Sequence, residues 1–332
     1  MGAERVFAYG AAAGLLGDLL LGDPRRGHPV AAFGRAATAV ERVLWRDHRG
    51  WGAVHTAVCA GGAVALGSLA QRAVRRSSAA SVALTAAATW SVVGGTSLAR
   101  EARAIGRALD AGDVEAARAR LPHLCGRDPQ ALDADGIARA VVESVAENTS
   151  DAVVGALVWG AAAGVPGLLG FRAVNTLDAM VGHKSPRYRR YGWASARLDD
   201  LAGWPGARLT AALAALAGPD PRGALRAWRA DAHRHPSPNA GPVEASFAGA
   251  LGVRLGGTLS YGGRVEHRPV LNRGGRAVAV ADIERAVRLS RRVGWLALGA
   301  GAAARFLAGP AARASAARAS AARASRGKGR TS

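Results

Sequence analysis

Residues 143–184 set the fold, and they read ESVAENTSDAVVGALVWGAAAGVPGLLGFRAVNTLDAMVGHK. A polar motif stands at each end of this stretch, and the apolar run between them, 152–171, has about the length that crosses a bilayer as a helix. If this run crosses fully, the two motifs lie on opposite sides of the membrane. Because Pro166 and Gly167 lie inside it, the alternative hypothesis is a break there that makes the segment a re-entrant hairpin. Such a hairpin would return the chain to the side it left and bring both polar motifs to one face.

Five further stretches have the same apolar character. They are rich in Ala, Gly, Val and Leu, while the Arg residues gather between them, and this distribution is typical of a membrane protein. The alternative is a soluble helical protein with Ala-rich core helices. The five stretches are 6–21, 53–70, 79–98, 201–218 and 294–309. We therefore predict an all-α fold, namely a polytopic integral membrane protein of the inner (cytoplasmic) cell membrane, multi-pass, with amphipathic helices in its loops.

The chain is expected to form one membrane-embedded catalytic domain over 1–309. Its soluble stretches are predicted at about 22–52, 99–151, 172–200 and 219–292. Gly10 and Gly14 stand one helical turn apart, a spacing that lets two membrane helices approach closely. Residues 310–332 repeat Ala-Arg-Ala-Ser with six basic residues and no acid, so we expect a disordered basic tail.

The net charge of +20 does not indicate a nucleic-acid-binding protein. The basic residues are dispersed among the loops, aromatic residues make up only 5%, and no zinc-finger or helix-turn-helix pattern is present. Arginines that flank membrane segments explain most of the excess, because they face anionic lipid and the cytoplasm. The two cysteines, Cys59 and Cys125, form neither a disulfide framework nor a metal-binding pattern.

The first polar motif is an array of acids. On a helix Glu143, Glu147 and Asp151 stand at i, i+4 and i+8, so the three carboxylates and the neighbouring Asn148 share one side. Like charges so placed repel one another unless a cation binds, and Mg²⁺ prefers such oxygen ligands. The alternative is a solvated helix face that ends in an Asn-Thr-Ser-Asp cap. Because the array adjoins a membrane segment, where carboxylates are costly, we favour a functional role.

The second motif combines acids with cations. Lys184 is one of only two lysines among 44 basic residues, which suggests a specified position. Carboxylates that can hold Mg²⁺ beside cations that can hold phosphate oxygens are the grouping that phosphoryl transfer requires. The cations alone would fit an ordinary basic cytoplasmic loop. No Walker-type GxxxxGK[ST] pattern is present. The residues of this motif are Asn175, Asp178, Lys184, Arg187, Arg197, Asp199 and Asp200.

Four long motifs together carry a specific resemblance. They are ESVAENTSD at 143–151, AVNTLDAMVGHKSPRYRRYGWASARLDDL at 173–201, SPNAGPVEASFAGALGVRLGG at 237–257 and GDPRRGHPV at 22–30. With these motifs the chain resembles the CobD/CbiB family of cobalamin-biosynthesis membrane proteins, the adenosylcobinamide-phosphate synthases. It departs from the family pattern at Ala31, where Arg is common, and at Pro242-Val243, where Trp-Pro is usual.

The resemblance implies a membrane ligase that uses ATP and Mg²⁺. It would join the propionate carboxyl of adenosylcobyric acid to the amine of (R)-1-aminopropan-2-ol or its O-phosphate, and other corrinoid-pathway membrane enzymes are possible partners. The alternatives are an AmpE-like membrane signalling protein and a non-catalytic scaffold for corrinoid enzymes.

Residue chemistry suggests how the two motifs would divide this work. We expect Mg²⁺ and ATP at Glu147, Asp151, Asp178 and Asp199 or Asp200, phosphate at Lys184, Arg187 and Arg197, a base at Glu143, and amide or acid contacts at Asn148, Asn175 and Asn239.

Overall fold

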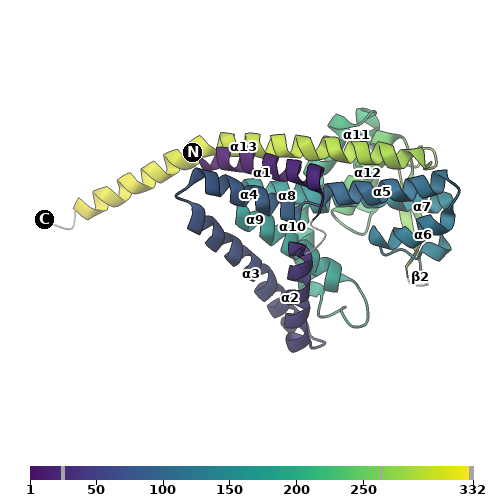
Figure 1. Cartoon of the computed structure of the whole chain (residues 1–332), viewed down its shortest axis with the longest axis horizontal. Helices are drawn as coiled ribbons and strands as arrows, with labels where there is room; N and C mark the ends of the chain where they lie inside the picture. Colours follow the sequence, from purple (N-terminus) through teal and green to yellow (C-terminus); the bar gives the residue numbers. More distant parts are fainter. Residues whose placement is uncertain (24–26, 262–263, 329–332) are drawn as a thin grey trace.

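The computed structural model describes residues 1–23, 27–261 and 264–328, and these are nearly all helical (Figure 1). The predicted helical fold is therefore confirmed in outline, and the one sheet among the described residues is a two-stranded hairpin. The helices are α1 (Ala3–Leu21), α2 (Pro29–Leu44), α3 (Arg49–Val74), α4 (Ser78–Val92), α5 (Gly95–Asp110), α6 (Val114–Arg120), η1 (Leu121–His123), η2 (Pro129–Ala131), α7 (Ala134–Thr149), η3 (Ser150–Val154), α8 (Gly155–Ala163), α9 (Val165–Leu177), η4 (Asp178–Gly182), α10 (Trp193–Ala217), α11 (Pro221–Asp231), η5 (Ala232–Arg234), α12 (Ala240–Leu251) and α13 (Ala281–Lys328). The strands are β1 (Leu255–Tyr261) and β2 (Arg264–Leu271).

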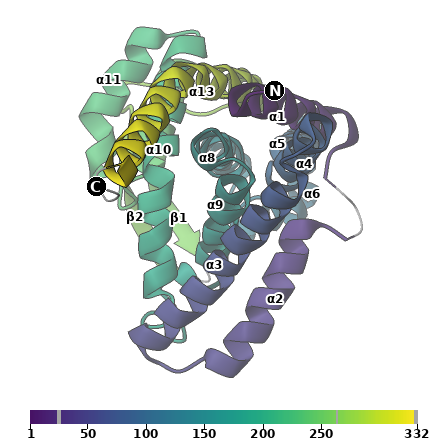
Figure 2. The same ribbon diagram turned by 90° about the vertical axis from the view of Figure 1, so that its left-hand side faces the viewer.

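Helix α1 packs between α4 and α13, and Figures 1 and 2 both show α13 beside it. A Cβ added at Gly10 or Gly14 would lie 2.5 Å from the Cβ of Thr85 or of Thr89 on α4, so the two helix backbones approach closely, as their spacing predicted. The one acid of α1 beyond its first turn, Asp18, is buried. Its Oδ2 accepts hydrogen bonds from the backbone N and the Oγ1 of Thr96, at 3.0 and 2.9 Å, in the first turn of α5.

The apolar run 152–171 folds back on itself. Helix α8 ends at Gly164, whose φ of +72° is a conformation that glycine adopts readily, and α9 then runs back against α8. Pro166 lies in the first turn of α9, where its missing N–H leaves no helix hydrogen bond unmade. The fold-back of the hairpin hypothesis is thus confirmed, with its turn at Gly164, two residues before Pro166, whereas its re-entrant position in a membrane stays a prediction.

Two π-helical turns interrupt the helices at the ends of this hairpin. One, η3, contains Asp151, and the other, η4, begins at Asp178. A π turn widens the helix locally and is frequent at functional sites. These turns were not predicted, and they change the simple i, i+4, i+8 arrangement of the acids of the first motif.

Two stretches are long and apolar enough to cross a membrane, within the part of the chain that the structure describes. They are Arg49–Val74, with a mean hydropathy of 1.5, and Ser78–Asp110, with 1.3. The first is α3, which forms with α2 an arm that projects from the bundle (Figures 1 and 2), and Leu66 and Leu69 on it are 64% and 63% exposed. The second includes both α4 and α5. The predicted multi-pass topology stays a prediction.

Three expectations differ from the structure. An all-α fold was wrong at residues 255–261 and 264–271, where β1 and β2 pair antiparallel, and Thr258, Val265 and Val270 in these stretches have high strand propensity. The stretch 219–292, predicted as soluble without assigned elements, contains α11 and α12. At the end of the chain α13 continues to Lys328, where we predicted a disordered tail, since Ala and Arg have high helix propensity. Residues 329–332 of that tail, and 24–26 of the GDPRRGHPV motif, lie outside the described residues.

Candidate active site

A cavity of about 590 Å³ lies where the two polar motifs meet. Its walls come from the end of α7, from η3 and η4, from the loop between η4 and α10, from the start of α10, from the segment before α12 with the start of that helix, and from β2. This size and this mixture of charged groups suit a small polar ligand. The polar side chains that line it are Glu147, Ser150, Asp151, Asp178, His183, Lys184, Tyr188, Arg189, Arg197, Asp199, Asp200, His235, Ser237, Asn239 and Arg268.

Asn175 joins the two motifs, although it does not line the cavity. Its Nδ2 lies 3.4 Å from Asp151 Oδ2 and 3.5 Å from Asp199 Oδ1, so one amide contacts acids from both motifs. Its Oδ1 accepts a long hydrogen bond of 3.4 Å from Arg172 Nη1. These contacts depend on the α8–α9 hairpin, because Asn175 lies at the end of α9 and Asp151 just before α8. Asn175 therefore positions acids, which was one of its two expected roles.

Glu143 lies away from the cavity that Glu147 and Asp151 line. Its carboxylate is 2% exposed, pairs with the buried Arg127 and accepts a 2.6 Å hydrogen bond from the backbone N of Gly256. Both partners hold this carboxylate within the protein, where it does not face the cavity. The geometry thus gives Glu143 the task of tying α7 to the start of β1, in place of the base that we expected.

Two other predicted residues, Arg187 and Asn148, also make their contacts outside the cavity. Arg187 stacks on Trp45 and its Nη2 donates to Glu41 Oε1 at 3.1 Å, so it lies against α2 and outside the cavity lining. Asn148 donates to the carbonyl oxygen of Ser144 at 2.9 Å, within its own helix. Arg189 and Arg268 line the cavity where Arg187 was expected.

Asn239 lines the cavity, yet both ends of its amide already have partners. Its Nδ2 donates to the carbonyl oxygen of Asp200 at 2.9 Å, and its Oδ1 accepts from Arg208 Nη1 at 3.0 Å. The side chain is buried at 8% exposure. Asn239 therefore holds the segment before α12 against α10.

The acids of the cavity raise one another's pKa. Burial, with the nearby carboxylate of Asp178, raises the pKa of Asp199 to about 7. Burial also raises the pKa of Asp151, and the carboxylate of Glu147 adds to this effect. Glu147 is enclosed by protein but its side chain is open to the cavity, and burial raises its pKa as well. Without a bound cation this wall therefore retains protons near neutral pH.

The donor set fits a divalent ion only in part. Among the described residues no three His, Cys, Asp or Glu side chains are grouped closely enough to hold a metal ion by themselves. Mg²⁺ commonly binds through one or two carboxylates, with phosphate oxygens and water as its other ligands. Asp151 and Asp199, which share the Asn175 amide, provide such a pair. The chemistry of the acids thus suits an ion that arrives with a phosphate ligand.

Sequence reasoning missed a group of residues from later in the chain. Glu244 on α12 is 4% exposed, and its Oε1 lies 3.9 Å from Nε2 of His235, which lines the cavity together with Arg268. Burial raises the pKa of Glu244 and lowers that of His235. A signal was present, because Glu244 is the one acid between Asp231 and Glu266 and lies in a run of small and apolar residues.

Comparisons with known proteins agree on one family. The family model described as CobD/Cbib protein matches residues 11–290. The cobalamin biosynthesis protein CobD of Mycobacterium tuberculosis is 56% identical over 290 residues, which cover 86% of this chain and 92% of that protein. The proteins of the same name from Chromobacterium violaceum and Rhodobacter capsulatus are 43% and 40% identical, over 89% and 83% of this chain and 96% and 90% of theirs. No solved structure matches the chain.

Proposed function

Because this chain belongs to the CobD/Cbib protein family, we propose that it is the adenosylcobinamide-phosphate synthase of cobalamin biosynthesis. The reaction joins adenosylcobyric acid to (R)-1-aminopropan-2-ol, or to its O-phosphate, by an amide bond at the expense of ATP. The observation that supports this most directly is the cavity in which acids and cations from three distant stretches of the chain converge.

The chemistry of amide formation explains why both charges are needed. A carboxylate resists attack by an amine and must first be activated, and transfer of the ATP γ-phosphoryl group to its oxygen gives an acyl phosphate. The carboxylate oxygen bonds to the γ-phosphorus as the bond to the bridging oxygen breaks, and ADP leaves. The amine nitrogen then bonds to the acyl carbon, phosphate leaves with the former carboxylate oxygen, and the nitrogen loses a proton.

The two walls of the cavity divide this work. Asp151 and Asp199, with Asp178 and Asp200 in the same wall, would hold Mg²⁺, which would neutralise charge on the phosphates. Lys184, Arg189, Arg197 and Arg268 would hold the phosphate oxygens and stabilise the charge that develops during transfer. Arg187 was expected to bind phosphate, but Arg189 and Arg268 line the cavity and are assigned this role.

Glu147 is our candidate for the base that accepts the amine proton. It is open to the cavity, whereas Glu143 is held by Arg127 and Gly256. Burial raises the pKa of Glu147, and a carboxylate with a raised pKa is a better proton acceptor near neutral pH.

We also propose that the chain is embedded in the cytoplasmic membrane, with the acid-lined cavity on the side that holds ATP. Two stretches long and apolar enough to cross a bilayer support this location. The exposed apolar residues of α3 and α10, such as Leu66, Leu69 and Leu201, support it further, because they have no cover within the chain.

The test is ATP consumption by the full chain purified in detergent, with both substrates supplied. We expect ADP, phosphate and a corrinoid amide in equal amounts, only when adenosylcobyric acid and the aminopropanol compound are both present. Parallel reactions with the free and the phosphorylated amino alcohol identify the acceptor. AMP in place of ADP would refute the acyl-phosphate step, and an absence of amide with either acceptor in active membranes would refute the proposed function.

Lys184→Met and Arg226→Met form a matched pair for this assay. Lys184 lines the cavity, whereas Arg226 is an exposed cation on α11 outside its lining. We expect the first variant to lose most activity, because a phosphate contact is removed, and the second to keep it.

A further inference from the structure

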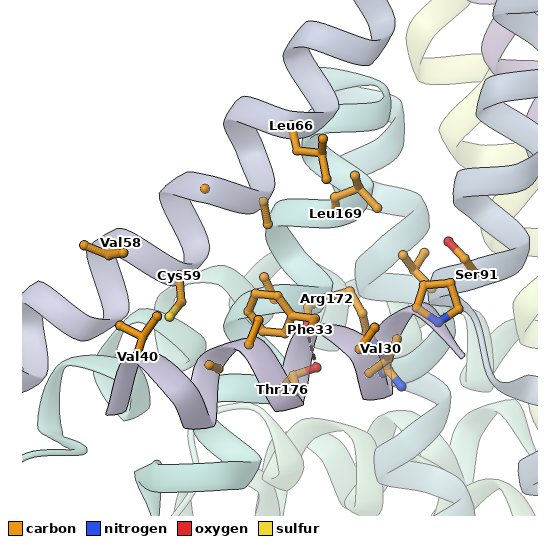
Figure 3. Close-up of a pocket in the computed structure, with 18 residues that line it drawn as sticks. Val30, Phe33, Val40, Val58, Cys59, Leu66, Ser91, Leu169, Arg172 and Thr176 are labelled. Atoms are coloured by element: carbon orange, nitrogen blue, oxygen red, sulfur yellow. Dashed lines mark hydrogen bonds between the residues drawn. The ribbon is translucent and has the colours of Figure 1, made fainter. Parts of the chain in front are cut away.

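A second cavity, of about 520 Å³, lies between α2, α3, α4 and α9, and it shares no lining residue with the acid-lined cavity. Figure 3 shows its walls, with Val30 and Phe33 on α2, Val58 and Leu66 on α3, and Leu169 on α9. The lining is almost entirely aliphatic or aromatic. We call it the apolar cavity.

The hydroxyl groups in the apolar cavity are already used within their own helices. Ser91 Oγ donates to the carbonyl oxygen of Ala88 at 2.9 Å, and Thr176 Oγ1 donates to that of Arg172 at 2.7 Å. A nucleotide base or a sugar needs uncommitted donors and acceptors to be recognised. The lining therefore suits a hydrocarbon chain better than a nucleotide or a corrinoid side chain.

One cation, Arg172, lies in the lining of this cavity (Figure 3). Among the described residues its guanidinium has no carboxylate within ion-pair distance, and its buried Nε has no hydrogen-bond partner. The carboxylates of Asp151 and Asp23 act on its charge only from beyond ion-pair distance. A largely enclosed guanidinium without a directly paired anion is costly, so this position suits an anionic group of a ligand.

Helix α2 separates the apolar cavity from a basic groove. Residues such as Phe33 and Val40 face the cavity, whereas Arg35 and Arg42 line the groove on the other side. The two spaces share Val30, Arg172 and Thr176. An amphipathic helix with arginines on its polar face is the kind that lies at a membrane surface and attracts anionic lipid.

We infer that the apolar cavity binds one anionic phospholipid, with an acyl chain between α2, α3 and α9 and the phosphate at Arg172. Charge complementarity supports this ligand. The apolar space fits the acyl chain, and the cation Arg172 at its end fits the anionic phosphate. The inference rests on the membrane location in the proposed function, because α3, one wall of the cavity, is a candidate membrane span.

The lipid phosphate would lie close to the acids of the active site. Arg172 Nη1 contacts Asn175 Oδ1 at 3.4 Å, and the same amide contacts Asp151 and Asp199. A phosphate at Arg172 would therefore fix the position of the Arg172 guanidinium, which in turn contacts Asn175.

The test measures lipid retention by the full chain in detergent, using native mass spectrometry. Phosphatidylglycerol and phosphatidylcholine with the same acyl chains are added in turn. We expect one phosphatidylglycerol per chain, held about tenfold more tightly than phosphatidylcholine, because both lipids carry the phosphate but the choline cation of phosphatidylcholine offsets the negative charge that attracts Arg172. Arg172→Gln should abolish this preference.

Two neighbouring glycines of α3 give a blocking variant and its matched control. A Cβ added at Gly62 or at Gly61 meets no atom within 4 Å, but only Gly62 lines the apolar cavity. Leucine favours a helix over glycine, so both variants should fold. Gly62→Leu should fill the cavity and prevent retention of phosphatidylglycerol, while Gly61→Leu should retain it as the wild-type chain does.

Equal retention of the two lipids by the wild-type chain, or undiminished retention by Gly62→Leu, would overturn the inference. Flotation with phosphatidylglycerol-containing vesicles tests the membrane location separately. A chain that floats but retains no phosphatidylglycerol refutes the lipid site alone, whereas a chain that does not float refutes the membrane location and with it the basis of the site. The ligase assay does not enter either measurement.

Discussion

Replacing Asp199 by Asn should stabilise the ligand-free protein at alkaline pH. The folded protein keeps Asp199 protonated up to about pH 7, because burial and the nearby Asp178 carboxylate raise its pKa from an ordinary value of 3.8. In the unfolded chain the same carboxyl is ionised above its ordinary value. Between these two pKa values folding therefore takes up a proton, and stability falls as the pH rises. Asn does not titrate, so D199N lacks this loss.

The size of the effect follows from the shift in pKa. A shift of about three units, at about 1.4 kcal/mol per unit, corresponds to about 4 kcal/mol as an upper limit. Water in the cavity and proton sharing with Asp151 and Glu147 reduce it, so we expect roughly 2 kcal/mol at pH 8. For a chain of this size that is an increase of a few degrees in the unfolding temperature. The gain should grow from pH 4 to about 7 and remain constant above.

The assay is thermal unfolding of both proteins in the same detergent, at pH 5 and at pH 8, without Mg²⁺ or nucleotide. Asp200→Asn is the matched control, because this neighbouring carboxylate faces the Arg197 guanidinium at 3.6 Å and its removal should bring no gain. The reasoning fails if D199N is no more stable than the wild-type protein at pH 8, or if its gain is as large at pH 5.

Three further predictions concern stability and turnover. Asn175→Ala should lower kcat roughly 10–100-fold with little change in unfolding temperature, because the amide orients two acids and carries no packing; steady-state kinetics and a thermal scan check this. Arg127→Met should cost about 3–5 kcal/mol by leaving Glu143 buried without its cation, and adding Glu143→Gln should recover part of the lost unfolding temperature. Gly164→Ala should cost about 1–2 kcal/mol, since its φ of +72° is strained for alanine, and should lower the unfolding temperature.

Much of the fold was predictable because it depends on local patterns. The apolar stretches gave helices, Gly10 and Gly14 gave a close helix contact, and a break near Pro166 gave the hairpin. Each of these depends on residues within one or two helical turns. The β hairpin, α11 and α12 were missed, because the frequent Gly and Pro residues of the long segment 219–292 obscure the periodicity of its helices and strands.

The candidate site was predictable in its residue types and less so in its contacts. Residues 143–184 alone indicate acids, cations and a hairpin that could bring them together. Which glutamate is the candidate base, however, depends on Arg127 and Gly256, because they hold Glu143 away from the cavity. Arg268 lines the cavity and Arg187 does not, because β2 places Arg268 there.

Such contacts join residues far apart in the chain, and their existence is decided by tertiary packing. The pKa of Asp199 also depends on tertiary packing, because its burial and its distance from Asp178 are set by the fold. Periodicity and composition therefore determined which segments are helices and which carry charge, since these are local properties of the chain. Only the packed structure decided which charges meet, because desolvation and pairing depend on distances across the fold.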